Sequence, residues 1–152
     1  MAQSLPRSDL TSLYLVLTYG GAIPFAMGTF CLALDISSVP FLGGTTDVIG
    51  AYGLIIASFL SGAHWGLHLH RIGGWAIFLA LFSNVSAIGL WIAFSALPPE
   101  AFLLALSFVF AILLAIDQRL ATDGLISQHY FRTRAVVTCI VVFLLIVSRL
   151  LV

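Results

Sequence analysis

The chain has 152 residues, of which 61% are hydrophobic and 8% are charged, and its formal net charge is zero. A soluble domain carries about 25% charged residues, so this composition excludes a water-facing globular domain and predicts an integral membrane protein. All six basic residues are arginine, and the zero net charge excludes the basic surface on which nucleic-acid binding depends.

Five apolar stretches approach the roughly 20 residues that a membrane-spanning helix needs. They cover residues 13–34, 48–69, 74–97, 99–116 and 135–152. Backbone polar groups in the bilayer core must hydrogen-bond within their own segment, so helices are expected. The sequence therefore predicts an all-α fold, namely an integral membrane bundle of five transmembrane helices forming a single domain over residues 1–152.

The segments between these stretches have the composition of turns. Residues 35–47 are rich in Pro, Gly, Ser and Thr, and residues 70–74 make a short cationic turn. Pro99 stands where a helix would start. Residues 117–134, DQRLATDGLISQHYFRTR, are predicted to form the one long polar loop.

The placement of arginine predicts the orientation. With a cytoplasmic N-terminus, five of the six arginines fall on the cytoplasmic side, and only Arg149 lies near the outer face. Those five are Arg7, Arg71, Arg119, Arg132 and Arg134. The reverse orientation would export them against the positive-inside rule. The N-terminus is therefore predicted to be cytoplasmic and the C-terminus periplasmic.

The first apolar stretch contains three residues spaced four apart, Gly20, Pro24 and Gly28. This spacing puts them on one helix face, where they are predicted to admit a close neighbouring helix. Pro24 removes a backbone hydrogen bond and is expected to kink the helix. A fixed bend is the preferred interpretation, and a gating hinge is the alternative.

The second stretch carries small residues and histidines on one face. At about 100° per residue, Gly50, Gly53, Ala57 and Ser61 share a stripe of about 80° with His64 and His68. Small residues let helices approach closely in lipid. This stripe is therefore predicted to be the packing face that points into the bundle, together with both imidazoles.

His68 is expected near the cytoplasmic boundary and His64 about 8 Å deeper at 1.5 Å rise per residue, and other polar residues are expected on the same side of the membrane. Asp117 ends the fourth stretch at the cytoplasmic level of His68, and the segment that follows supplies further polar side chains, Tyr130, Arg132 and Arg134. These residues, with His64 and His68, form the candidate polar cluster. No catalytic residue is predicted among them.

The histidines have several possible roles. Hydrogen bonding between helices is the preferred one. Spacing of i, i+4 can place two imidazoles on one metal ion, but the same helix turn holds no Glu, Asp or Cys and the chain has no second such pair. Neither a metal nor haem or another cofactor is predicted. Contact with protons, a quinone or a substrate stays open, because ionisable groups within a membrane are functional candidates.

Three motifs resemble an uncharacterised family of small polytopic membrane proteins that includes the transmembrane protein 69 group. They are YGGAIPF in the first stretch, AYGLIIASFLSGAHWGL in the second, and Asp117 followed by YFRTR before the last. The resemblance covers most of the chain. It implies a five-helix protein of bacterial inner membranes with organelle relatives, and it implies no substrate.

The functional prediction is a non-enzymatic accessory or assembly subunit that docks to a larger bioenergetic complex of the inner membrane. Short connections and few reactive groups favour that role, whose partners are the lipid bilayer and other membrane subunits or a homo-oligomer. One alternative is a small transporter or proton conductor using His64, His68 and Asp117. The other is a redox or lipid enzyme that binds quinone, haem or metal.

Overall fold

The computed structural model describes residues 7–70 and 72–152, with side chains described from Leu13 onward. Within this part of the chain, five helical segments are long and apolar enough to cross a membrane. They are Leu13–Ala33, Thr45–His68, Gly74–Ala96, Pro99–Thr122 and Gln128–Leu150. The chain is therefore an integral membrane protein, and the predicted helical membrane fold is confirmed.

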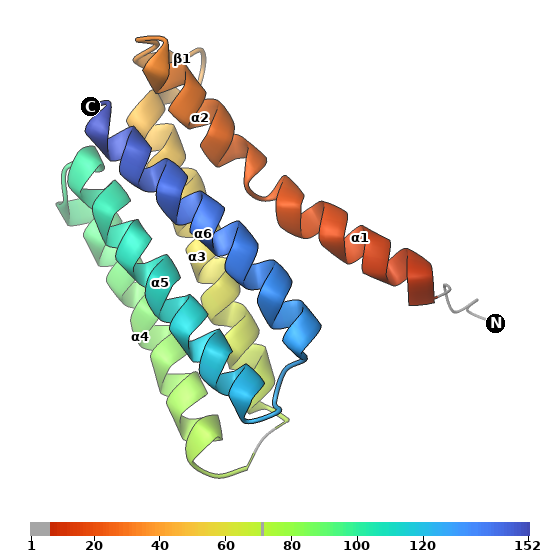
Figure 1. Cartoon of the computed structure of the whole chain (residues 1–152). Helices are drawn as coiled ribbons and strands as arrows, with labels where there is room; N and C mark the ends of the chain where they lie inside the picture. Colours follow the sequence, from red (N-terminus) through yellow and green to blue (C-terminus); the bar gives the residue numbers. More distant parts are fainter. Residues whose placement is uncertain (1–6, 71) are drawn as a thin grey trace.

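The helices form an up-and-down bundle from which the first helix leans away (Figure 1). Their bounds are α1 Arg7–Gly20, α2 Ile23–Ala33, α3 Thr45–His68, α4 Gly74–Ala96, α5 Pro99–Thr122 and α6 Gln128–Leu150. Helix α5 contacts α3, α4 and α6. The start of α1 and the α3–α4 and α5–α6 connections lie at one end, which we call the N-terminal end of the bundle. The C-terminus lies at the opposite end.

The first spanning segment is two helices rather than one bent helix. Helix α1 ends at Gly20 and α2 begins at Ile23, with Pro24 in the first turn of α2. Proline has no N–H for the helical hydrogen bond, and its ring clashes with the carbonyl four residues earlier. The predicted kink is thus a break before Pro24, and it redirects α1 away from the bundle.

The close contact predicted along Gly20, Pro24 and Gly28 is made at Gly28 alone. A methyl group added at Gly28 would overlap the Ile49 side chain of α3, whereas one added at Gly20 would meet nothing within 4 Å. Pro24 is exposed. The break between α1 and α2 explains this difference, because it turns the face carrying Gly20 out of line with the face carrying Gly28.

A small β-hairpin joins α2 to α3, which the all-α prediction did not include. Strands β1 (Ser38–Val39) and β2 (Gly43–Gly44) pair antiparallel. Gly43 adopts a φ of 102°, which glycine reaches without the penalty of a Cβ atom. The hairpin lies at the end of the bundle that also holds the C-terminus (Figure 1).

The long loop predicted over residues 117–134 is wrong, because only residues 123–127 separate α5 from α6. Gly124, at a φ of 71°, closes α5 in a Schellman motif, with Leu125 N–H bonding to Leu120 C=O at 2.8 Å and Gly124 N–H bonding to Ala121 C=O at 3.2 Å. The Ser127 hydroxyl caps α6 by accepting from the Tyr130 N–H. These caps let polar residues extend both helices.

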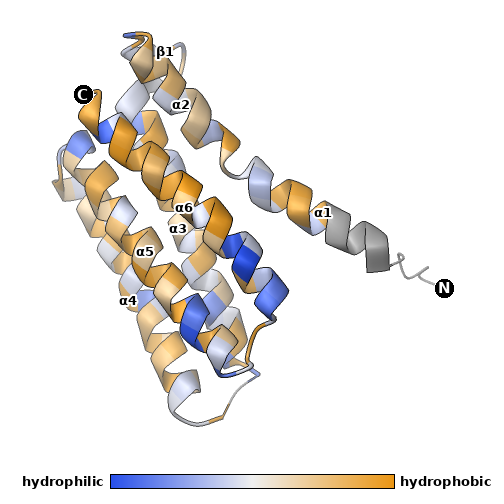
Figure 2. Cartoon of the chain, in the orientation of Figure 1, coloured by the Kyte–Doolittle hydropathy of each residue, from blue (hydrophilic) through white to orange (hydrophobic). Residues whose placement is uncertain are grey.

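The small-residue stripe of α3 lies against the bundle interior. Its buried residues include Gly50, Gly53, Ala57, Ser61 and His64. A methyl group added at Gly53 would lie 2.5 Å from the Cδ1 atom of Leu106 on α5. The helices are otherwise apolar along most of their length, with hydrophilic residues concentrated near the end of α5 and the start of α6 (Figure 2).

Candidate functional site

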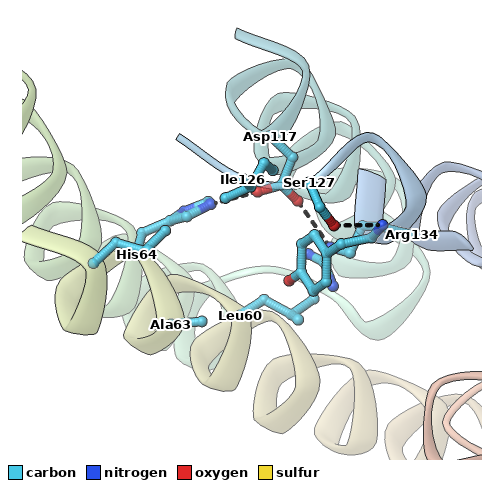
Figure 3. Close-up of a pocket in the computed structure, with 9 residues that line it drawn as sticks. Leu60, Ala63, His64, Asp117, Ile126, Ser127 and Arg134 are labelled. Carbon is cyan, nitrogen blue, oxygen red and sulfur yellow. Dashed lines mark hydrogen bonds and ion pairs between the residues drawn. The ribbon is translucent and has the colours of Figure 1, made fainter. Parts of the chain in front are cut away.

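Three helices bring one histidine, one aspartate and one arginine together inside the bundle. Nε2 of His64 on α3 lies 2.8 Å from Oδ1 of Asp117 on α5, and Nε of Arg134 on α6 lies 2.8 Å from Oδ2 of the same carboxyl group (Figure 3). The three side chains are 3%, 4% and 11% exposed. We call these residues the His64–Asp117–Arg134 triad.

The triad lies inside the helices rather than at their tips. His64 precedes the end of α3 by one turn, and Asp117 precedes the end of α5 by more than one turn. At 1.5 Å rise per residue, these positions are roughly 6 to 8 Å from the helix ends. The carboxylate and the guanidinium are therefore largely buried, and each must be satisfied by its neighbours.

The donors and acceptors in the triad follow from the charges. Arginine stays protonated in proteins and can only donate, so Asp117, paired with Arg134, is a carboxylate that only accepts. His64 must then carry its hydrogen on Nε2 to donate to Asp117. Nδ1 of His64 is buried and has no hydrogen-bond partner among the described residues.

Two adjoining cavities open beside the triad. The first, which we call the polar cavity, has a volume of about 450 Å³ and is lined by His64, Asp117 and Ser127, among others. The second, the apolar cavity, has a volume of about 430 Å³ and extends between α1, α2, α3, α5 and α6. Four residues line both cavities, namely Leu60, Ala63, Tyr130 and Arg134.

Aromatic side chains form much of the wall of the apolar cavity. The rings of Tyr14 on α1 and Tyr130 on α6 stack with centroids 5.8 Å apart and an interplanar angle of 30°. Phe25, Phe59 and Phe110 also line this cavity. The arrangement places an ionic, hydrogen-bonding end next to a long apolar wall.

The comparison with known families assigns the chain over nearly its whole length. Residues 10–150 match the family model described as "Protein of unknown function (DUF3429)". The chain belongs to the DUF3429 family. No curated protein and no solved structure matches it. The narrower likeness to the transmembrane protein 69 group stays a prediction.

In this DUF3429 protein, two of the candidate polar residues lie apart from the triad. His68 is hydrogen-bonded through Nδ1 to the Trp65 carbonyl of its own helix. Its ring also makes an edge-to-face contact with the Trp65 indole, with the ring centroids 4.3 Å apart. Arg132 is exposed. His68 and Arg132 are not among the residues that line the polar cavity, whereas Tyr130 is.

No group of three His, Cys, Asp or Glu residues that could hold a metal ion occurs among the residues that the structure describes. The triad itself contributes a single imidazole and a single carboxylate, and both face Arg134 or one another. Its chemistry is that of a charge-balanced hydrogen-bonding network in which one imidazole nitrogen has no partner among the described residues.

Reasoning from the sequence missed several residues that shape the site in the DUF3429 protein. Tyr14, Leu60, Ala63 and Ser127 line one or both cavities but were not among the candidates. Leu60 and Ala63 lie beside His64 on α3, and a search of the helix face next to the histidine stripe would have found them. Tyr14 offered no such signal, because its approach to Tyr130 depends on the angle of α1.

Proposed function

We propose that this DUF3429 protein binds a small amphipathic molecule between α1, α3, α5 and α6. The polar part of the molecule occupies the polar cavity, and its apolar part extends along the apolar cavity. The observation that carries this proposal is the pair of adjoining cavities with a buried ionic triad at one end.

The energetics of burial support a role for the triad beyond holding helices together. Charged side chains within a membrane protein are costly and mark functional sites by default. Replacing a buried ion pair by apolar side chains is often neutral or stabilising, so packing alone gives little reason to keep Asp117 and Arg134. The cavities of about 450 and 430 Å³ also lie in the range of roughly 300–1,000 Å³ that small-molecule sites occupy.

Filling the junction of the two cavities tests this proposal. Ala63 lines both cavities and is exposed, so Ala63→Phe is expected to obstruct them while leaving the helix contacts intact. The probe is dodecyl-dimethoxybenzene, titrated into the detergent-solubilised protein and detected as a one-to-one adduct by native mass spectrometry. We expect Ala63→Phe to weaken binding about tenfold or more.

The matched control is Ala111→Phe, which adds the same ring at an exposed position of α5 that lines neither cavity. This variant is expected to bind like the wild type. Equal affinity of the two variants for the probe, or no adduct of the wild type with either this ether or the corresponding dodecyl-hydroquinone, would refute the binding site.

An accessory or assembly role in a larger inner-membrane complex is the second candidate. Helix α1 favours it, because α1 leans away from the bundle and exposes Leu13, Val16 and Leu17 (Figure 1). A role limited to docking against other subunits or a second copy predicts no saturable adduct with the amphipathic probe.

Transport or proton conduction by His64, His68 and Asp117 has less support than either of these functions. His68 lies apart from the polar cavity, so the three residues do not line one path.

The proposed orientation places the triad near the cytoplasm in a bacterial inner membrane. Arg119, Arg132 and Arg134 lie toward the N-terminal end of the bundle, whereas Arg149 lies in the last turn of α6 at the opposite end. An alkaline phosphatase domain fused after Val152 is expected to be active, because it would reach the periplasm. A fluorescent protein that folds only in the cytoplasm should stay dark at the same position, and fluorescence there would reverse the orientation.

A further inference from the structure

We infer that the bound molecule has a neutral aromatic headgroup with a hydroxyl group, and that this hydroxyl donates a hydrogen bond to Nδ1 of His64. The inference rests on the proposed binding function and assigns the chemical class of the ligand. A phenol or hydroquinone with an apolar tail has this chemistry. Three features of the site support this ligand class, namely the imidazole of His64, the charge balance and the aromatic walls.

The imidazole requires a donor. His64 donates from Nε2–H to Asp117, and Asp117 also accepts from Nε–H of Arg134. Because Arg134 already balances the carboxylate, a second positive charge on the buried ring would be costly, so we take His64 as the neutral tautomer whose Nδ1 has a free lone pair. His64 is 2% exposed, and Nδ1 has no partner among the described residues. A buried acceptor without a donor is unfavourable. Nδ1 itself is covered by its neighbours, so a hydroxyl group that enters from the polar cavity, which His64 lines, would satisfy it after a small movement of those neighbours.

The charge balance favours a neutral headgroup. The ionisable side chains that line the two cavities are His64 on α3, Asp117 on α5, Tyr130 and Arg134 on α6, and Tyr14 on α1. The one carboxylate and the one guanidinium are paired at 2.8 Å. An anionic headgroup would compete with Asp117 for Arg134 and leave a carboxylate unpaired.

The aromatic walls of the two cavities favour a planar, aromatic headgroup. Tyr130 lines both cavities and stacks on Tyr14, and three phenylalanines continue the aromatic wall of the apolar cavity. Aromatic rings prefer offset-stacked or edge-to-face contacts with other rings. A planar headgroup can therefore contact Tyr130 while its hydroxyl reaches toward His64, and an alkyl tail can follow the apolar cavity.

A pair of probes in which the two hydroxyl groups are either free or methylated tests the inference. Dodecyl-hydroquinone is compared with dodecyl-dimethoxybenzene in the full-length protein by native mass spectrometry under reducing conditions. The wild type is expected to bind the hydroquinone about tenfold more tightly than its ether. In His64→Phe, which keeps a ring of similar size but removes the acceptor, the two affinities should be about equal. Tyr130→Phe removes the phenolic hydroxyl of a residue that lines both cavities. This variant should keep the tenfold preference for the hydroquinone.

The outcomes test the chemical class of the ligand separately from the existence of the binding site. Equal affinities in the wild type overturn the inference even where His64→Phe fails to fold, and a preference lost in Tyr130→Phe but kept in His64→Phe assigns the hydroxyl contact to Tyr130 instead. If the ether binds and is blocked by Ala63→Phe while the hydroquinone has no advantage, the proposed function stands and the inference fails. If neither probe binds, both fail.

Discussion

Asp117→Leu is expected to lower the free energy of unfolding by about 3–5 kcal/mol, the usual cost of removing one partner from a buried ion pair. The change leaves the Arg134 guanidinium, which is 11% exposed, without its carboxylate, and it also leaves Nε2–H of His64 without an acceptor. The measurement is equilibrium unfolding by denaturant in a mild detergent, alongside the melting temperature. This is the largest single-residue effect that the structure predicts.

Two further variants separate the loss of the charge pair from a simple change of shape. Asp117→Leu combined with Arg134→Met removes both charges and is expected to recover part of the lost stability, because no buried charge is then left unpaired. Arg132→Met changes an exposed arginine on the same helix and should alter stability by no more than about 0.5 kcal/mol. A double variant no more stable than Asp117→Leu would contradict the account of the triad.

Gly53→Leu is expected to destabilise the bundle by about 1–3 kcal/mol through overpacking. A Cβ atom at Gly53 would lie 2.5 Å from the Leu106 Cδ1 atom and 3.4 Å from the Phe25 Cε1 atom. Leu106 is fully buried and lines neither cavity, so its methyl group has no open space to move into. The melting temperature in detergent should fall, and far-ultraviolet circular dichroism below the transition should still report helix.

The matched control is Gly62→Leu on the same helix. A Cβ atom at Gly62 would meet nothing within 4 Å, and leucine has a higher helix propensity than glycine. Its melting temperature is expected to equal or exceed that of the wild type. If the two leucine variants melted at the same temperature, the stripe through Gly53 would not be a close helix contact.

Composition and hydropathy were sufficient to predict the membrane class and the spanning helices. Apolar stretches of about 20 residues separated by turn residues leave the helix as the stable spanning structure, because the backbone has no other hydrogen-bond partner in the bilayer core. The face of α3 that contains Gly53 and Ala57 could also be identified, since helical periodicity is a local property of the sequence. Helix ends in the polar segments were not predicted, because the Gly124 and Ser127 caps extend α5 and α6 beyond the apolar residues.

For the site too, the sequence predicted the approximate positions of residues along their helices, and only the tertiary structure determined which of them meet. The sequence itself placed His64, His68 and Asp117 near the cytoplasmic ends of spanning segments, with Asp117 at the level of His68 and His64 deeper. It did not separate His64 from His68, since both lie on one helical stripe. Tertiary structure separated them, because α5 packs against α3 where Asp117 can reach His64, while His68 lies beyond that contact and bonds to its own helix.

Only the tertiary structure decided where the cavities lie. The walls of the polar cavity come from α3, α5, α6 and the connection between α5 and α6, whereas α1 and α2 also line the apolar cavity. The volume of the apolar cavity therefore depends on the angle that α1 takes after the break before Pro24. Periodicity reports which face of a helix is apolar, but it carries no information on how far a neighbouring helix lies from that face. The approximate length and polarity of each apolar segment were therefore determined by the sequence itself. The space between α1 and the bundle was determined by packing among residues far apart in the chain.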